Sequence, residues 1–380
     1  MDLHLGENLR SFFQIKSALE DDRVGGPRPI DADELDIQQA FVDLKVPLPV
    51  GPGGATVTVR GGRQELIYGA QRLIGPLDWA NTRRTFEGGK VIVQFSKIHS
   101  LDVFWVRPVL VDKEEPNDGD GKTSFAGIYD TLLVPALLDE KAKSRLELYG
   151  LVLNRTGAAW PTEGVGDEDR YTLGARLTSN PKPLDLDVEA DYQFGRFGSG
   201  DISAWALAAE GGYTFVGAAF SPRPFLGVDL ASGDRHPNDG ELNTFNQLFP
   251  TGHPHLGYID AVWRQNIVDI RGGVEVTPLE NRPWAKKAAV RTEYHMFWRQ
   301  RDGDALYNSG GAPYRGTGPL AAGADSGRIG EELDLLLNWQ IDRHAAAYFG
   351  YSHLVAGEFI AETGPSGDID FVYAALTYTF

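Results

Sequence analysis

The sequence predicts an all-β protein that forms a single antiparallel β-barrel across a membrane. Three observations lead to this fold class. Segments that alternate between apolar and polar residues recur along the whole chain of 380 residues, and the connections between them alternate between long and short. In addition, no apolar run approaches the length of about 18 residues that a membrane-spanning helix needs. A transmembrane barrel has no such run because its apolar residues occupy alternate positions.

About sixteen segments have the period of two that puts successive side chains on opposite faces of a strand. Most of them offer enough residues for a tilted membrane crossing, which takes roughly 9–11. In chain order they cover residues 8–17, 39–46, 55–60, 91–95, 101–111, 123–134, 144–154, 170–178, 184–194, 202–215, 220–231, 267–277, 288–299, 332–341, 345–356 and 369–380.

The segment 184–194 shows the alternation most clearly, with apolar residues from Leu184 to Phe194 on one face. The other face carries Asp185, Asp187, Glu189, Asp191 and Gln193. In a soluble sandwich this acidic face would simply meet water. In a barrel it must face the lumen, because a charge on the lipid face costs about 2–4 kcal/mol for Arg or Lys at the midplane and less for Asp or Glu.

The last segment, 369–380, ends on the aromatic residue Phe380. Such an ending is typical of the closing strand and assembly signal of a bacterial outer-membrane barrel. A half-buried strand in a soluble sheet is the alternative. As a closing strand, this segment is expected to pair antiparallel with the first one, 8–17, so that no sheet edge is left open.

The connections favour the membrane barrel over the soluble sheet. Long polar connections are predicted at residues 20–33, 66–89, 112–122, 156–168, 232–263, 301–328 and 357–368. Short ones are predicted at 47–54, 98–100, 179–183, 216–219 and 342–344, and the turn 196–201 is a short exception among the outer ones. Short periplasmic turns and long extracellular loops are typical of outer-membrane barrels. The economical reading is one domain over residues 1–380, wide enough for an aqueous channel that inward-folded loops could narrow.

Composition excludes several classes of function. The absence of cysteine removes disulfides, thiolate metal sites and cysteine nucleophiles. A net charge of −17 argues against a nucleic-acid partner, which needs a basic face. No Ser-His-Asp or zinc motif is present, and we expect no catalytic residue, cofactor or metal site. His253 and His255 are interpreted as solvated loop residues.

Two stretches carry a family resemblance. The first spans residues 61–88 and contains Gly62-Arg63-Gln64, Tyr68-Gly69 and Asp78-Trp79-Ala80-Asn81-Thr82-Arg83-Arg84-Thr85-Phe86. The second contains Phe245-Asn246-Gln247-Leu248-Phe249-Pro250-Thr251. Both resemble the signatures of the alginate-export family of outer-membrane porins. The resemblance implies a monomeric barrel that passes an anionic uronate polysaccharide through an arginine-lined pore. Relatives have about eighteen strands, so eighteen are possible here as well.

Arginine suits such a pore because its planar guanidinium pairs bidentately with carboxylates and stays charged. The candidate pore-lining residues are Arg60, Arg63, Arg72, Arg83, Arg84, Arg145, Arg170, Arg176, Arg271, Arg291, Arg299, Asp185, Asp187, Glu189, Asp191 and Glu293, with Glu332 and Asp334 as further interleaved acids. For each arginine near the first motif, bracing of the loop is an equally good interpretation. Asp78, Trp79 and Asn81 are predicted to form a structural frame for that loop.

The preferred function is a passive channel in the outer membrane of a Gram-negative bacterium for an anionic polysaccharide or oligosaccharide such as alginate. Its expected partners are membrane lipid, lipopolysaccharide, the polysaccharide cargo and periplasmic secretion proteins. The alternative is a general or uptake porin for other small solutes or cations, which the acidic composition favours. An enzyme or adhesin with its site in the outer loops is a third possibility.

Overall fold

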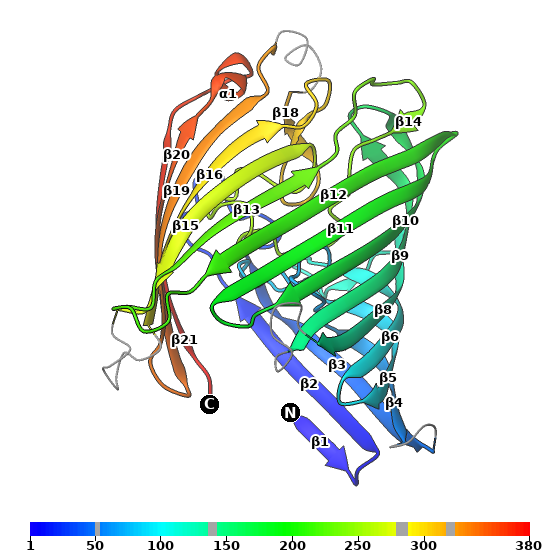
Figure 1. Cartoon of the computed structure of the whole chain (residues 1–380). Helices are drawn as coiled ribbons and strands as arrows, with labels where there is room; N and C mark the ends of the chain where they lie inside the picture. Colours follow the sequence, from blue (N-terminus) through cyan, green and yellow to red (C-terminus); the bar gives the residue numbers. More distant parts are fainter. Residues whose placement is uncertain (50–53, 136–142, 279–287, 317–323) are drawn as a thin grey trace.

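The computed structural model describes residues 1–49, 54–135, 143–278, 288–316 and 324–380. Within these residues, sixteen strands of at least nine residues form one antiparallel sheet that curls around an interior (Figure 1). They are β2 (Leu9–Ala18), β3 (Asp33–Leu48), β4 (Ala55–Gln64), β5 (Phe86–Ser96), β6 (His99–Leu110), β8 (Thr123–Pro135), β9 (Lys143–Trp160), β10 (Gly164–Ser179), β11 (Leu184–Phe197), β12 (Gly200–Tyr213), β13 (Arg223–Ala231), β15 (Ile267–Val276), β16 (Ala288–Arg299), β19 (Arg328–Gln340), β20 (Ala345–Ala356) and β21 (Ile369–Tyr378). The predicted fold class and strand count are confirmed.

Each long strand pairs with the next one along the chain, so the sheet is a meander. The smaller elements are β1 (Asp2–Leu5), β7 (Asp118–Gly119), β14 (Glu241–Leu242), β17 (Leu306–Tyr307), β18 (Pro313–Arg315) and α1 (Glu358–Glu362). Among the described residues, no helix has the length and apolar character needed to cross a membrane.

The first and last long strands do not pair in the predicted way. Strand β21 pairs only with β20, and β2 pairs with β1 and β3. The prediction that 369–380 closes against 8–17 is therefore wrong for the described strands. The reason is local: β1 folds back as a hairpin and occupies the edge of β2 from Leu9 to Phe12.

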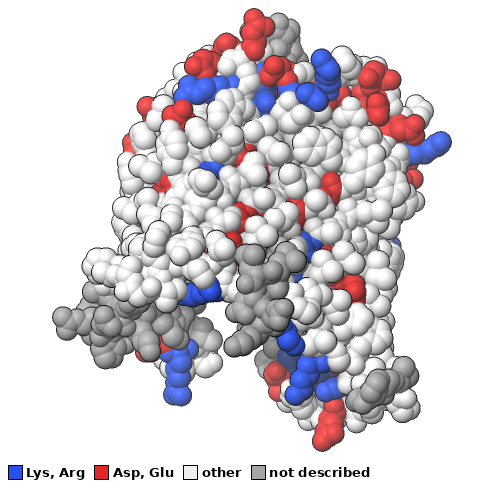
Figure 2. All heavy atoms as spheres, in the orientation of Figure 1, with Lys and Arg blue, Asp and Glu red and all other residues white. Residues whose placement is uncertain are grey.

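The strands show an apolar outer face and a polar inner face. On β10 and β11, Leu173 and Tyr192 are about half exposed, whereas Arg170, Glu189 and Asp191 are at most 5% exposed. The acidic face of 184–194 thus turns inward, as predicted from the cost of charge in lipid. In Figure 2 most charged side chains gather at the upper rim and the lower end, with a broad, largely uncharged belt between them. A belt of exposed apolar side chains indicates contact with lipid.

Long connections lie at one end of the sheet and short turns at the other, the end where both termini lie (Figure 1). One predicted long loop, 156–168, is wrong. Strands β9 and β10 continue through it to a turn of three residues at 161–163. At 18 and 16 residues, these strands exceed the roughly 9–11 that a crossing needs, so their hairpin projects beyond the membrane.

Candidate functional site

Two long connections, 65–85 and 232–266, fold inward and meet; we call them the inner loop pair. The backbones of Ile74 and Phe249 form a parallel bridge. The Gly75 N–H donates to the Phe249 carbonyl at 2.8 Å, and the Thr251 N–H donates to the Gln71 carbonyl at 2.8 Å. These connections carry the two sequence motifs, so the structure brings together motifs that lie more than 150 positions apart.

Apolar packing fixes the inner loop pair against the wall of the sheet. Leu66, Ile74 and Phe245 are almost fully buried and belong to the same core cluster as Phe86 and Phe125 of the wall. The Phe249 ring contacts both wall rings, at centroid distances of 5.1 and 4.9 Å. The main core therefore fills part of the space that the curled sheet surrounds.

The three residues predicted to frame the first motif contact the second loop, the wall and neighbouring connections. Trp79 stacks on His253 of the second loop with ring centroids 3.8 Å apart, and it meets Tyr373 of β21 edge-on at 4.9 Å. The Asn81 amide donates to the Asp31 carbonyl at 2.9 Å, and Asp78 pairs with a neighbouring arginine of the same motif. These contacts tie the inner loop pair to the wall and to the first outer connection.

The interpretation as solvated loop residues is wrong for His253, whereas His255 is partly exposed. His253 is 5% exposed and shares a hydrogen bond of 3.0 Å with Asp260. His255 lies 2.8 Å from the Ala70 carbonyl. Burial, followed by the positive charges of Arg72 and Arg264, holds the pKa of His255 well below its usual range.

An arginine of the inner loop pair reaches the acidic ladder on β11. Arg72 is 3% exposed, and its Nη1 lies 2.8 Å from Glu189 and 3.2 Å from Asp187. Burial alone would lower the pKa of Arg72, but Glu189 and Asp187 outweigh it and raise the pKa. Arg176 of β10 binds Asp187 and Glu147 at 2.7 Å each. Two acids of the ladder, Asp187 and Glu189, are thus paired with arginines from the loop and from the neighbouring strand.

Most of the other nominated arginines also have carboxylate partners. Arg60 binds Asp43 at 2.6 Å, and Arg63 binds Glu87 at 2.6 Å. Arg83 forms a bidentate pair with Glu65, with both bonds at 2.8 Å, and this hydrogen bonding raises the pKa of Arg83. For these three residues the structure favours the bracing interpretation over an open charge in the pore.

The arginines of the later strands are equally engaged. Arg170 is fully buried and binds Glu168 at 2.6 Å, while Arg291 binds Glu293 at 2.8 Å. Arg271 lies 3.2 Å from Asp269. Arg299 donates hydrogen bonds to backbone carbonyls of an outer connection, including that of Asp302 at 2.8 Å. On the other acids of the ladder, Asp185 pairs with Arg223 and Asp191 accepts a hydrogen bond of 2.7 Å from Tyr149.

Two nominated arginines differ from the rest. Within the described parts of the chain, no carboxylate lies at ion-pair distance from Arg84 or Arg145. Arg84 Nη1 donates to the carbonyls of Gly75 at 3.1 Å and Pro250 at 3.0 Å, so it joins both halves of the inner loop pair. Burial lowers the pKa of Arg84 to about 10, which leaves it charged at neutral pH. Its side chain remains partly exposed.

Arg145 lies at the opposite end, in a cavity of about 600 Å³ at the short-turn side of the sheet. Its lining is strongly charged and mixed in sign. It includes Arg145, Arg176, Lys182, Arg223, Asp185 and Glu210. A charged and polar lining of this kind suits hydrated ions and sugars better than apolar ligands.

Sequence reasoning missed several residues of the interior. Tyr149 bridges Glu189 and Asp191 at 2.8 and 2.7 Å, and Arg264 pairs with the fully buried Asp229. The alternation of β9 could have placed Tyr149 on the inner face. The pair of Arg264 and Asp229 depends on how the connection 232–266 folds, so no local sequence pattern predicts it.

Comparisons with known proteins agree with this architecture. A family model described as alginate export matches residues 1–372. No curated protein matches the chain. Similar crystal structures include three from Pseudomonas aeruginosa. OpdK with vanillate is 11% identical (TM-score 0.59, covering 97% of this chain and 86% of that one). OccK8 (OprE) is 13% identical with a TM-score of 0.57, and the match covers 97% of this chain and 87% of that one. OccD3 (OpdP) is 12% identical with a TM-score of 0.55, and the match covers 91% of this chain and 78% of that one.

Proposed function

Because the chain belongs to the alginate export family, we propose that it is a passive channel for anionic uronate-type polysaccharide or oligosaccharide such as alginate. It is a Gram-negative outer-membrane β-barrel with the fold of the porins. We further propose that it works as a single-domain monomer without a catalytic step. Its partners are then membrane lipid, lipopolysaccharide, its cargo and proteins of periplasmic secretion.

The observation that carries this proposal is the open charge of Arg84. Its guanidinium is held in the inner loop pair by two carbonyls and has no carboxylate partner among the described residues. A passing uronate carboxylate can supply that partner through bidentate hydrogen bonds. The fixed carbonyl contacts hold the guanidinium in place, so little side-chain freedom is lost when the carboxylate arrives.

The paired arginines support the same proposal in another way. Arg72 and Arg176 pair with Asp187 and Glu189 of β11, which weakens the repulsion between this wall and a polyanion. Selectivity in a charged pore depends on which sign lines its narrowest part. With these two acids paired, Arg84 and Arg145, which have no carboxylate at ion-pair distance among the described residues, would provide a positive path despite the net charge of −17.

Planar-bilayer recordings test this proposal. We expect the wild-type channel to prefer anions and to be blocked by oligouronate. Arg84→Gln should lower the anion-to-cation permeability ratio roughly threefold, the equivalent of about 0.7 kcal/mol for an ion pair in a wet site. The control is Arg343→Gln, an exposed arginine in the turn between β19 and β20. Cation preference of the wild type without oligouronate block would overturn the proposal.

A second candidate function is an uptake porin for other small solutes or cations. The buried acids Glu332 and Asp334 favour it, because no arginine or lysine pairs with them in the described residues. A related structure, OpdK, holds vanillate, so small carboxylates belong to this candidate class. Liposome-swelling assays separate the two functions: equal rates for neutral and anionic sugars favour the uptake porin.

A further inference from the structure

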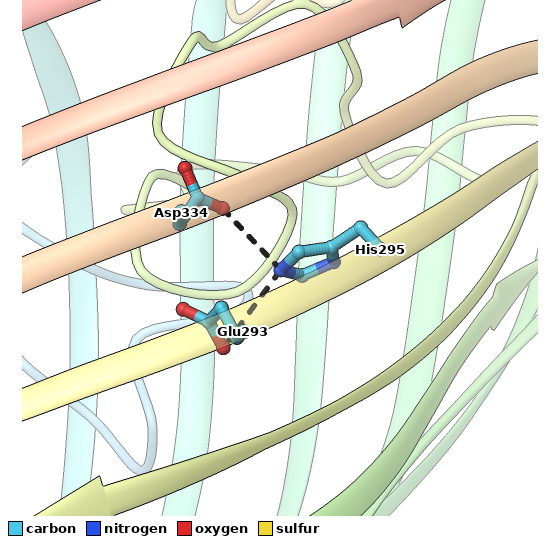
Figure 3. Close-up of side chains that lie close together, drawn as sticks. All are labelled: Glu293, His295 and Asp334. Atoms are coloured by element: carbon cyan, nitrogen blue, oxygen red, sulfur yellow. Dashed lines mark ion pairs between the residues drawn. The ribbon is translucent and has the colours of Figure 1, made fainter.

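Three buried side chains converge on the inner face of β16 and β19, away from the inner loop pair's arginines. Glu293 and His295 come from β16 and Asp334 from β19, and they are 2%, 1% and 0% exposed (Figure 3). The intervening Tyr294, Leu333 and Leu335 are exposed on the outer face. Strand alternation therefore turns the three polar groups inward together.

Their atoms have the spacing of an incipient metal site. His295 Nε2 lies 3.8 Å from Glu293 Oε2 and 3.9 Å from Asp334 Oδ2, and one ligand atom from each residue falls within 4.8 Å of the others. A tetrahedral site with bonds of about 2.1 Å has ligand atoms roughly 3.4 Å apart. Small rotations of the side chains close that difference.

The histidine is oriented for coordination. Its Nδ1 lies 3.0 Å from Asp269 Oδ1 on β15. Donation of the Nδ1 proton to this carboxylate leaves the Nε2 lone pair directed at Glu293 and Asp334. A carboxylate that holds the far nitrogen of a histidine ligand is the usual second layer of zinc sites.

Each of the three residues also has one side-chain atom that is unused, which for Glu293 is Oε1 and not the Oε2 measured above. Glu293 Oε1, His295 Nε2 and Asp334 Oδ2 have no hydrogen-bond partner among the described residues. The other oxygens are occupied, since Arg291 donates to Glu293 Oε2 at 2.8 Å and Ser352 donates to Asp334 Oδ1. Buried polar atoms without partners are costly and call for a ligand.

Charge supports the same conclusion. Glu293 and Asp334 are direct cross-strand partners, and His295 faces Glu332, whose Oε2 is also unpartnered. Like charges directly opposite one another destabilise a sheet. Within the described residues, Arg291 on Glu293 is the only arginine or lysine paired with these acids, so a divalent cation would offset the remaining repulsion.

We propose that Glu293, His295 and Asp334 bind one divalent transition-metal ion, with Zn²⁺ as the best match, which joins β16 to β19 inside the barrel wall. One imidazole and two carboxylates suit Zn²⁺, whereas Ca²⁺ and Mg²⁺ prefer sites made of oxygen ligands alone. The site is independent of the cargo. Its role is to fix the register of two neighbouring strands.

Metal titration of the purified, untagged protein tests the site. After treatment with a chelator, the wild type should bind one Zn²⁺ per chain by calorimetry and gain thermal stability with added Zn²⁺. Co²⁺ should give the visible absorption of a tetrahedral site. His295→Gln should abolish all three signals. The control, His353→Gln, changes a histidine on the next strand whose ring contacts Asp370 instead, and it should bind like the wild type.

A further variant keeps the test decisive if His295→Gln fails to fold. Asp269→Asn retains all three ligands, and it should weaken Zn²⁺ binding about 10–100-fold because the histidine loses its orienting carboxylate. Absence of stoichiometric Zn²⁺ binding by the chelated wild type overturns the proposal outright. So does equal Zn²⁺ affinity in His295→Gln and the wild type. Either result would assign His295 to an ion pair with its acidic neighbours.

Discussion

At the scale of single residues, pairing decides which arginines can act on a passing solute. Arg72 is a candidate pore-lining residue because it lies in the stretch that carries the first motif, yet Glu189 and Asp187 compensate its charge. Arg84 lies twelve positions later in the same loop, where it donates hydrogen bonds to two carbonyl oxygens and lies 5.7 Å from the centroid of the Phe249 ring. A buried pair neutralises its own field, whereas an arginine bonded to carbonyls keeps its full charge.

His255 supplies a prediction for pH. Its pKa is held well below the usual value by burial and then by Arg72 and Arg264, so the folded protein keeps the ring neutral. The unfolded chain binds this proton below about pH 6.5. Stability contributed by the neutral ring is therefore present above that pH and is lost as the pH falls, by up to about 1.4 kcal/mol per pH unit.

The measurement compares wild type with His255→Gln, in which an amide can still donate to the Ala70 carbonyl. Unfolding free energies at pH 7.0 and 5.5 give the slope for each protein. We expect a smaller loss on acidification in the variant. Equal slopes would mean that His255 titrates alike in the folded and unfolded states.

At the scale of elements, the strands were predictable and their partners inside the barrel were not. The alternation at 184–194 fixes its inner face because lipid rejects the acids from Asp185 to Asp191. By contrast, Arg72 meets Glu189 only because a loop folds inward across 117 positions of sequence. The same holds for the site at His295, where i, i+2 spacing puts Glu293 on its face but only strand register brings in Asp334.

The incorrect loop at 156–168 has a related cause. Strands β9 and β10 are long enough to leave the lipid before their hairpin turns. Beyond the lipid neither face has to be apolar, so apolar and polar residues need not alternate strictly there. Glycines such as Gly157, Gly164 and Gly166 then suggest a loop, although backbone pairing continues with a register shift at Gly166. Hydrophobic periodicity reports the lipid-covered part of a strand rather than its full length.

A pair of glycines gives a prediction for the strands below the first inner loop. Gly62 of β4 and Gly88 of β5 lie opposite each other with φ of 128° and 150°. A Cβ on Gly88 would lie 2.3 Å from the Trp105 carbonyl oxygen. We expect Gly88→Ala to destabilise the barrel by about 1–3 kcal/mol, since both the backbone conformation and the close approach forbid a side chain.

Gly61 is the matched control, because it lies beside Gly62 and a Cβ there would meet nothing within 4 Å. Gly61→Ala should leave stability unchanged or raise it slightly. Denaturant titrations of both variants in detergent give the comparison. A loss as large in Gly61→Ala as in Gly88→Ala would show that the close contact with the backbone is unimportant.

At the scale of the whole molecule, the outer surface is mainly apolar, as contact with lipid requires, whereas the interior carries many charged side chains. The chain carries 53 acidic and 36 basic residues; on the face that Figure 2 shows most of the visible ones lie at the two ends, and many others are buried in the interior. An interior with so many carboxylates is stable only when cations face them. The arginine pairs and the proposed metal site meet this requirement on different walls.

Substitutions at two positions of strand β10 test where the membrane lies along the barrel. Leu173 lies in the middle of β10 and is 57% exposed, while Val165 lies near its outer end and is 76% exposed. Leu173→Arg should cost about 2–4 kcal/mol in folding into lipid vesicles, because it puts a charge at the midplane of the bilayer. Val165→Arg should cost no more than about 1 kcal/mol, because the β9–β10 hairpin stands in water. Urea titrations in lipid measure both, and equal costs would place the hairpin inside the bilayer.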